Sequence, residues 1–462
     1  MADRHDRNGR GDDVDAWLGE RIDPLAPPPG TFDLIKRRAR RRKYRRLAIT
    51  ATSAAFVVAA AVTVPQVVNL PVLSENPTSP PVAGAGHSGS MTPTVYGSAV
   101  PPSTAGSGES RLAPVPDNFR PTSVTFVSTR TGWVIGQAST PGHCFTNFCT
   151  SVARTNDAGR TWSGVHAPLT GAPDGATGVS QIRFLELDDG WAYGPGLYAT
   201  HSGGATWEPV DTGGQRVTDL ETVGQRVFAL WATCTGTGSA YAGHCTSFTL
   251  YSAPGRGGSW TPVGPTTTGL ARGSSGQAPA LTLTGSRGYL LTAGGTLYAG
   301  PIDGSAAWQK AGSLPGACDT AGTATLIGTV DATDLLAACL SPGSNAAQTG
   351  KTEQKLVYSS SDGGASWVKL ASAPAAGTAT SLSASPSGSL LLATDHGIEL
   401  LPKGTSTWQD AALAAPVPAG GFSYVGMTTS EQGIALPADP SAGAVWFSFD
   451  GGQTWKPSAV SS

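Results

Sequence analysis

Six cysteines and three repeated carboxylates are the residues of this 462-residue chain whose types and spacing could do chemistry. Cysteines can form disulfides or bind a soft metal ion, and they stand at Cys144, Cys149, Cys234, Cys245, Cys318 and Cys339. Asp157, Asp362 and Asp450 stand in nearly identical surroundings and could act as acid–base groups or cation ligands. The seven histidines are scattered without a ligand-spaced pair, so we expect no metal site.

Other catalytic motifs are incomplete or missing from the sequence. Thr349-Gly350-Lys351-Thr352 resembles the end of a phosphate-binding loop, but Asn345 stands where that motif needs its first glycine. Neither G-x-S-x-G nor H-E-x-x-H occurs. We therefore expect no catalytic residue and no cofactor.

The charge distribution divides the chain near residue 47. The first 46 residues hold 13 Lys and Arg against 8 Asp and Glu, a balance of +5, and the remainder holds 17 against 24, a balance of −7. An acidic outer part excludes a cationic surface for nucleic acid there. Glycine (61) and proline (35) are abundant and only 13 % of residues are charged, which favours short strands joined by turns over long helices.

A membrane anchor is predicted next to the basic N-terminal segment. Lys36 to Arg46 is almost entirely cationic, and residues 47–64 carry no charge. Eighteen helical residues would span about 27 Å, near the thickness of the bilayer core. Because positive charge stays cytoplasmic, we expect a tail at 1–46 inside, a transmembrane helix at 47–70, a Pro/Ser/Gly-rich linker at 71–118 and an extracytoplasmic domain at 119–462. A cleaved signal peptide is the alternative.

The cysteines agree with this topology, since all six follow the apolar segment and an oxidising compartment favours disulfides. The excess of arginine over lysine (22 to 8), with abundant Ala, Gly, Pro and Thr, indicates a high-GC, actinobacterial origin.

A repeat ending in tryptophan runs through the outer domain. The sequences TNDAGRTW (155–162), SSDGGASW (360–367) and SFDGGQTW (448–455) share the pattern [ST]-x-D-x-G-x-[ST]-W, and THSGGATW (200–207) has serine in place of the aspartate. Weaker copies end at Trp260, Trp308 and Trp408. The seven tryptophans recur about every 50 residues, a period typical of solenoids and propellers.

Each repeat also contains strand signals. In the first, SVTFV (123–127), GWVIGQ (132–137) and SVART (151–155) precede the final turn, and a short strand follows it. In the second, QIRFLEL (181–187), GWAYG (190–194) and LYATH (197–201) keep this order. Four strands in each of seven repeats predict an all-β, seven-bladed β-propeller.

These motifs resemble the Asp-box, or BNR, repeats of bacterial sialidases, and the strand–GWxxG–strand–box order is similar to photosystem II assembly-factor-like propellers. The resemblance covers about 119–462. It implies that the box is a local hairpin in which hydroxyl and carboxylate oxygens accept backbone N–H groups, glycine adopts positive φ and tryptophan packs on the blade. The box residues are then structural: Thr155, Asp157, Gly159, Trp162, Trp207, Ser360, Asp362, Gly364, Trp367, Ser448, Asp450, Gly452 and Trp455.

In such a propeller the box turns lie on one face, and the longest insertions (137–150, 232–245 and 340–355) concentrate on the other. Six cysteines allow fifteen pairings, but this topology favours Cys144 with Cys149, Cys234 with Cys245, and Cys318 with Cys339. Restrained loops on a rigid scaffold often carry binding, although the disulfides could simply restrain long loops. The candidate binding residues on these loops are His143, Phe145, Phe148, Tyr241, His244 and Lys351.

Three functions stay open from the sequence. The first is a membrane-anchored, non-catalytic binding, scaffold or assembly module for an extracytoplasmic protein or glycan. The second is a sialidase-like hydrolase, which needs an arginine triad; Phe119-Arg120-Pro121 partly matches the first arginine segment, but no arginine follows Arg287. The third is a transmembrane sensor whose tail contacts a cytoplasmic partner.

Overall fold

The computed structural model describes residues 113–461 apart from 140–148, 171–177, 235–244, 269–278, 293–294, 317, 319–324, 330, 341–354, 372 and 375. The predicted tail, transmembrane helix and most of the linker lie outside these residues. Within the described residues, no helix has the length and apolar character needed to span a bilayer.

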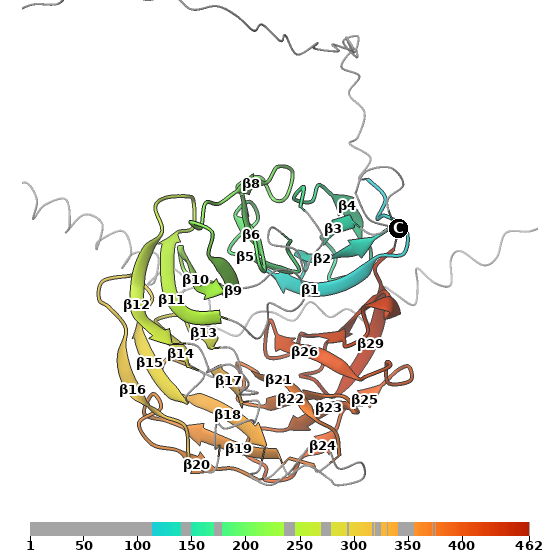
Figure 1. The fold of residues 1–462 in the computed structure, drawn as a ribbon. Helices are drawn as coiled ribbons and strands as arrows, with labels where there is room; N and C mark the ends of the chain where they lie inside the picture. The colour runs from blue at the N-terminus through green and yellow to red at the C-terminus, as the bar shows by residue number, and fades with distance from the viewer. Residues whose placement is uncertain are drawn as a thin grey trace, which may run out of the picture. The chain divides into compact units, whose positions relative to one another are not determined.

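Seven antiparallel sheets follow one another around a ring, as Figure 1 shows. The first three blades contain β1 (Arg120–Phe126), β2 (Gly132–Ala138), β3 (Cys149–Thr155) and β4 (Ser163–Val165); β5 (Gln181–Phe184), β6 (Gly190–Tyr193), β7 (Leu197–Thr200) and β8 (Glu208–Pro209); and β9 (Arg216–Val223), β10 (Arg226–Cys234), β11 (Cys245–Pro254) and β12 (Thr261–Thr268). In each blade neighbouring strands pair in chain order.

The remaining blades repeat this order. They contain β13 (Ala280–Leu283), β14 (Arg287–Leu291), β15 (Thr296–Pro301) and β16 (Gln309–Ser313); β17 (Thr325–Thr329), β18 (Leu335–Leu340), β19 (Lys355–Ser360) and β20 (Val368–Lys369); β21 (Ala379–Ala384), β22 (Leu390–Thr394), β23 (Gly397–Leu401) and β24 (Gln409–Asp410); and β26 (Phe422–Met427), β27 (Gly433–Pro437), β28 (Ala444–Ser448) and β29 (Thr454–Ala459). A short strand, β25 (Ala412–Leu413), pairs in parallel with β29, and a one-turn 3₁₀ helix, η2 (Pro440–Ala442), precedes β28. The predicted seven-bladed propeller of four-stranded blades is confirmed.

The hydrophobic core lies between blades. One cluster joins Trp133 and Ile135 of blade 1 to Ile182 and Phe184 of blade 2, and equivalent clusters fill each later interface around the ring. The Trp133 and Phe184 rings are stacked with centroids 3.7 Å apart. Because each sheet is covered on both faces by its neighbours, middle strands such as β2 and β22 are almost continuously apolar.

The ring closes by packing between its first and last blades. Phe119 and Val124 share a core cluster with Ile434 and Phe447. Gln432 Nε2 donates to the Thr129 carbonyl at 2.9 Å, and the Ser458 hydroxyl donates to the Gly159 carbonyl. In the described chain, the four strands of blade 1 all come from its N-terminal part and those of blade 7 from its C-terminal part, so no sheet combines the two ends.

The packed chain begins slightly before the predicted boundary at 119. Ala113 forms a bridge to Gly164 on the outer strand of blade 1. Val115 is buried in the cluster that closes the ring. These residues therefore cover the outer edge of blade 1.

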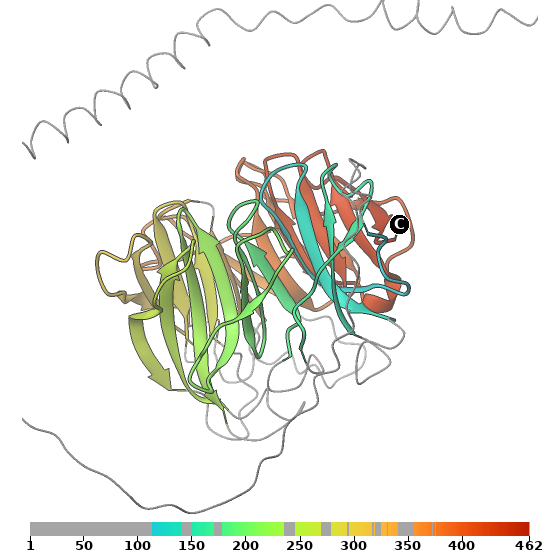
Figure 2. The same cartoon turned by 90° about the horizontal axis from the view of Figure 1, so that it is seen from above.

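The box turns lie on the same face as the turns between the first and second strands. In blade 1 the Ala158 N–H donates to the Arg130 carbonyl, and in blade 7 the Gly451 N–H donates to the Glu431 carbonyl, both at 2.9 Å. Blades 2 and 5 contain the corresponding bond. Figure 2 shows the ring from its side, with strands running between two faces; we call the one with these turns the box face.

Candidate functional site

A repeated β-bulge shapes the inner strands that line the central channel. The register shifts beside Thr122 in β1, Thr218 in β9, Thr380 in β21 and Ser423 in β26. In each case the hydroxyl donates to a carbonyl of the second strand of its own blade, at Ile135, Leu230, Ala393 and Leu436 respectively. The bulge turns the next side chain away from its own sheet.

In three blades that next side chain reaches the neighbouring blade. Ser123 accepts from the Ile182 N–H and Ser381 from the Val425 N–H, both at 3.2 Å. Asp219 holds the equivalent position in blade 3, and its Oδ2 accepts from the Leu281 N–H at 2.8 Å. A hydroxyl is therefore sufficient for this contact between blades, and at Asp219 the chain uses a carboxylate instead.

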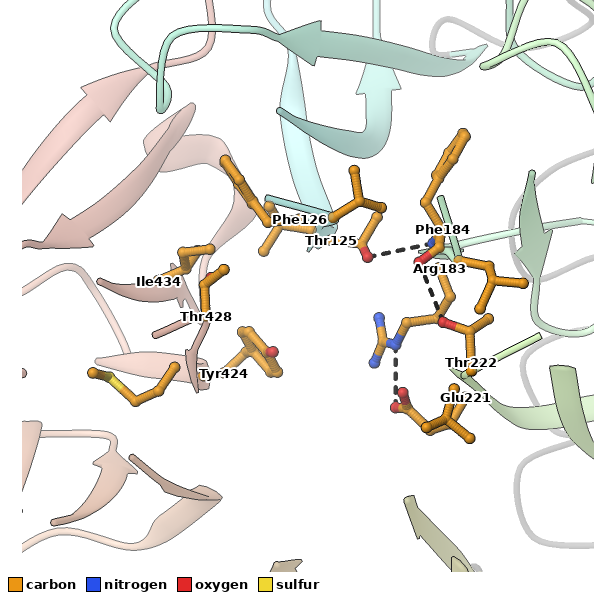
Figure 3. A pocket seen from close by; sticks show the side chains of 16 residues that line it. Thr125, Phe126, Arg183, Phe184, Glu221, Thr222, Tyr424, Thr428 and Ile434 are labelled. Atoms are coloured by element: carbon orange, nitrogen blue, oxygen red, sulfur yellow. Dashed lines mark hydrogen bonds and ion pairs between the residues drawn. The ribbon is translucent and has the colours of Figure 1, made fainter. Parts of the chain in front are cut away.

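Two charged side chains from adjacent blades meet in the channel. Arg183 Nε on β5 donates to Glu221 Oε1 on β9 at 3.1 Å, and the exposed fractions of the two side chains are 18 % and 30 %. Arg183 Nη1 donates to the Ile182 carbonyl and to the Ser123 hydroxyl. Figure 3 shows Arg183 extending from β5 toward Tyr424, with Glu221 beside it.

Burial and neighbouring charges shift the pKa values of Arg183 and of the ionisable side chains near it. Burial disfavours the charged form of Arg183, but the Glu221 carboxylate together with Tyr193, Tyr424 and Asp219 outweighs burial and raises the pKa of the guanidinium. Burial and then repulsion from Glu221 raise the pKa of Asp219 to about 7, although hydrogen bonds from Leu281 and Leu220 oppose the shift. Burial also raises the pKa of Tyr424, so its hydroxyl stays protonated at neutral pH.

These side chains face a cavity of about 430 Å³ at the box-face end of the channel. Its position follows from the lining, which includes the final residues of the inner strands and their turns. The lining residues are Val124, Thr125, Phe126, Val127, Arg183, Phe184, Leu185, Glu221, Thr222, Val223, Gly224, Tyr424, Gly426, Met427, Thr428 and Ile434. We call this space the channel cavity.

The described lining of the channel cavity has no net charge but contains hydrogen-bond donors and acceptors. Arg183 and Glu221 are the charged side chains among its lining residues in the described chain, and their charges cancel. Arg183 Nη2 and Glu221 Oε2 remain available, because the ion pair uses Nε and Oε1. Thr125, Thr428 and Tyr424 add hydroxyls along the wall. Such a surface can bind a partner that both donates and accepts hydrogen bonds.

The described residues that line the channel cavity include none of the binding residues predicted from the sequence. His143, Phe145, Phe148, Tyr241, His244 and Lys351 are outside the described residues. The described strand ends on either side of these residues, such as Ala138 and Cys149 in blade 1, lie on the face opposite the box face. The channel cavity is thus a separate candidate that sequence reasoning missed. A detectable signal was Arg183, a charged residue inside the predicted first strand of the second repeat (181–187).

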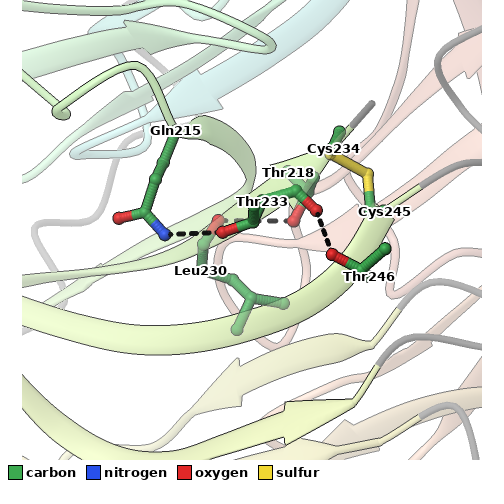
Figure 4. Close-up of a disulfide and its surroundings, with 7 residues drawn as sticks. All are labelled: Gln215, Thr218, Leu230, Thr233, Cys234, Cys245 and Thr246. Carbon is green, nitrogen blue, oxygen red and sulfur yellow. Dashed lines mark hydrogen bonds between the residues drawn. A yellow bond between two sulfur atoms is a disulfide. The ribbon is translucent and has the colours of Figure 1, made fainter. Parts of the chain in front are cut away.

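Two predicted disulfides are confirmed. Cys234 and Cys245 face each other at the end of the β10–β11 pair, as Figure 4 shows. Cys318 and Cys339 are bonded and both almost completely buried. Cys149 is also disulfide-bonded, whereas its predicted partner Cys144 lies outside the described residues.

In three box turns both oxygens of the aspartate accept hydrogen bonds from within the turn. Asp450 Oδ1 accepts from the Ser448 hydroxyl and the Thr454 N–H, and its Oδ2 accepts from the Thr454 hydroxyl. The same contacts surround Asp157 and Asp362. Gly159, Gly364 and Gly452 each donate to the box hydroxyl at Thr155, Ser360 and Ser448 and adopt positive φ.

The box tryptophans differ in burial. Trp162 and Trp455 are buried, whereas Trp207 and Trp367 are partly exposed. The indoles of Trp207 and Trp367 donate to carbonyls at His166 and Ser313 in the preceding blades. These two rings therefore connect neighbouring blades.

Comparisons with known proteins bear on the fold alone. No family model matches the chain, and neither does any curated protein. Solved structures to which it is similar include YCF48 bound to D1 peptide, at 18 % identity over 62 % of this chain and 81 % of that chain with a TM-score of 0.39. YCF48 from Cyanidioschyzon merolae shows 15 % identity, coverage of 61 % and 85 %, and a TM-score of 0.40. Penicillium chrysogenum alpha-L-arabinanase complexed with arabinobiose shows 11 % identity over 70 % of this chain and 91 % of that chain, with a TM-score of 0.37.

Proposed function

We propose that the protein is a non-catalytic binding module, anchored in the membrane by residues 47–70, whose channel cavity receives part of an extracytoplasmic partner. The observation that supports this role is the Arg183–Glu221 pair, which crosses between two blades and keeps one donor and one acceptor free. A preformed, partly buried cavity with few oriented polar groups is typical of binding sites. Since the pair is neutral as a whole, the bound portion of the partner is uncharged.

The arrangement favours binding over sialidase-like hydrolysis. Arg183 is the one arginine among the cavity-lining residues that the structure describes, whereas recognition of a sialic acid carboxylate uses three. Arg120 lies at the exposed start of β1 and does not line the cavity. Asp219 is not among the residues that line the cavity, and both of its carboxylate oxygens accept backbone N–H groups, which supports a structural role between blades.

Site-specific photo-cross-linking tests the proposal. A benzophenone amino acid replaces Met427 in the cavity wall, and the matched control carries it at Leu169, which is 94 % exposed and follows the last strand of blade 1. In cells that produce the protein, irradiation should join one defined partner at Met427 and not at Leu169. Arg183→Gln should remove that product. The same product from both positions, or one unaffected by Arg183→Gln, would contradict the proposal.

A further inference from the structure

A second cavity contains an acidic group whose hydrogen bonding is incomplete. Glu399 on β23 is 4 % exposed, and its Oε1 accepts from Lys355 Nζ at 2.7 Å. Lys355 is fully buried, and its ammonium also donates to the carbonyls of Ala376 and Gly377. An ammonium has three protons, so Lys355 has none left for the second carboxylate oxygen.

That second oxygen, Glu399 Oε2, is buried without a hydrogen-bond partner in the structure. A buried carboxylate oxygen without a donor is costly because it loses water and receives nothing in return. Burial also raises the pKa of Glu399, against the opposing effect of Lys355. The site therefore lacks one donor.

A second carboxylate lies directly across the sheet. Glu399 and Asp410 are partners in the β23–β24 register, so their side chains share one face. Like charges in this position repel each other, and the Lys355 ammonium is committed to Glu399. His396, at the neighbouring turn, is exposed and bonds to Asp395. A further positive charge would satisfy both carboxylates.

Both carboxylates line a cavity of about 410 Å³. Its other lining residues are largely apolar and include Ile398, Leu413 and Val417, with Thr394 and His396 as the polar members. Val417 is 44 % exposed, which leaves an apolar surface at the cavity. The turn at 395–397 joins the second and third strands of blade 6, so this cavity belongs to the face opposite the box face and is separate from the channel cavity.

We propose that this cavity binds a primary alkylammonium group, with the charged nitrogen between Glu399 and Asp410 and the aliphatic chain against Leu413 and Val417. An ammonium suits the site better than a planar guanidinium, because Glu399 offers one free oxygen rather than two. The apolar wall suits an organic cation rather than a hydrated metal ion. Such a group occurs in free amines and in lysine side chains of proteins.

Calorimetric titration of the propeller-containing full chain tests this site, with n-butylammonium as the free amine and N-acetyl-lysine-N-methylamide as the peptide form. Saturable binding of either probe supports the proposal. Binding of both indicates a lysine-bearing partner, and binding of butylammonium alone indicates a free amine. Neutral 1-butanol should not bind. Absence of saturable binding by both amines would overturn the proposal.

Variants separate charge recognition from folding. Asp410→Asn keeps an exposed side chain of the same shape and should weaken butylammonium binding by about tenfold. Glu399→Gln should abolish binding, and the double variant Lys355→Met with Glu399→Gln avoids a lone buried lysine if the single variant does not fold. Glu208→Gln, an exposed carboxylate on β8, is the matched control and should leave binding unchanged. Equal affinity in wild type and Asp410→Asn would contradict the assignment.

Discussion

At the scale of single residues, the pair between Arg183 and Glu221 joins two blades that share no backbone ladder. Its side chains are partly exposed, so solvent screens the attraction, and we expect a coupling free energy of about 1 kcal/mol. A double-mutant cycle with Arg183→Gln and Glu221→Gln, measured by urea unfolding, checks this value. Coupling near zero would show that the two side chains contribute independently.

Asp219 carries an ionisable carboxyl group at a position where an uncharged hydroxyl is sufficient. Ser123 and Ser381 make the same contact between blades. The pKa of Asp219 is raised from 3.8 to about 7, so between these pH values the folded chain holds a proton that the unfolded chain has lost. The contribution of Asp219 to stability is therefore present below pH 4 and is lost as the pH rises toward 7.

Asp219→Ser should remove this dependence. The free energy of unfolding of the variant minus that of wild type should be larger at pH 8 than at pH 5, as measured by urea unfolding at both pH values. Ser381→Ala removes an equivalent but uncharged contact, so its effect should be independent of pH. A parallel pH dependence in wild type and Asp219→Ser would contradict the shifted acidity.

At the scale of elements, the box turn is a hairpin held by one carboxylate. Asp450→Ala should lower the free energy of unfolding by about 1–2 kcal/mol, because two backbone N–H groups and two hydroxyls lose their acceptor. Asp450→Ser should lose less stability than Asp450→Ala, since in the box of blade 2 Ser202 accepts from the Thr206 N–H. Thermal unfolding of the two variants provides the comparison.

The same turn should respond to acid. Burial opposes the charged form of Asp450, but the hydrogen bonds from Thr454 and its neighbours outweigh burial and lower its pKa. A carboxylate with a lowered pKa contributes stability above its unfolded value of about 4, and this contribution is lost at lower pH. The difference between wild type and Asp450→Ala should therefore shrink below pH 4. A constant difference would indicate that the aspartate's charge is unimportant.

The Cys234–Cys245 bond closes the end of the β10–β11 hairpin. The two cysteines are 11 residues apart, and a cross-link across a loop of this size stabilises a protein by about 2–3 kcal/mol. The double variant Cys234→Ser with Cys245→Ser should lose about this amount in urea unfolding. The loss should equal that of reducing the same bond selectively, and an unchanged midpoint would mean that the loop is restrained by other contacts.

At the scale of the whole molecule, the predicted anchor separates the propeller from the basic segment. A variant lacking residues 1–70 should move from the membrane fraction to the soluble fraction while keeping the melting temperature of its propeller. Replacing Ala55 and Val58 by arginine in the full chain should have a similar effect, because charge at the centre of a bilayer is costly. Retention of both variants in the membrane fraction would contradict anchoring by this segment.

The sequence by itself determined the blade count and the position of the box turns, because these depend on local patterns. Alternating strand residues, turn glycines and terminal tryptophans repeat within about 50 residues, and each blade uses consecutive strands. The disulfide pairs 234–245 and 318–339 were predictable for the same reason, since hairpin topology brings their strand ends together.

Only the tertiary structure decided which side chains from different blades meet. Arg183 and Glu221 are 38 residues apart, and Lys355 and Glu399 are 44 apart. Their encounters depend on sheet register and on the angle between blades, and neither has a local pattern in the sequence. The binding loops predicted from the insertions and their cysteines stay a prediction, because their residues lie outside the described chain. The two cavities emerged from contacts between blades that periodicity does not encode.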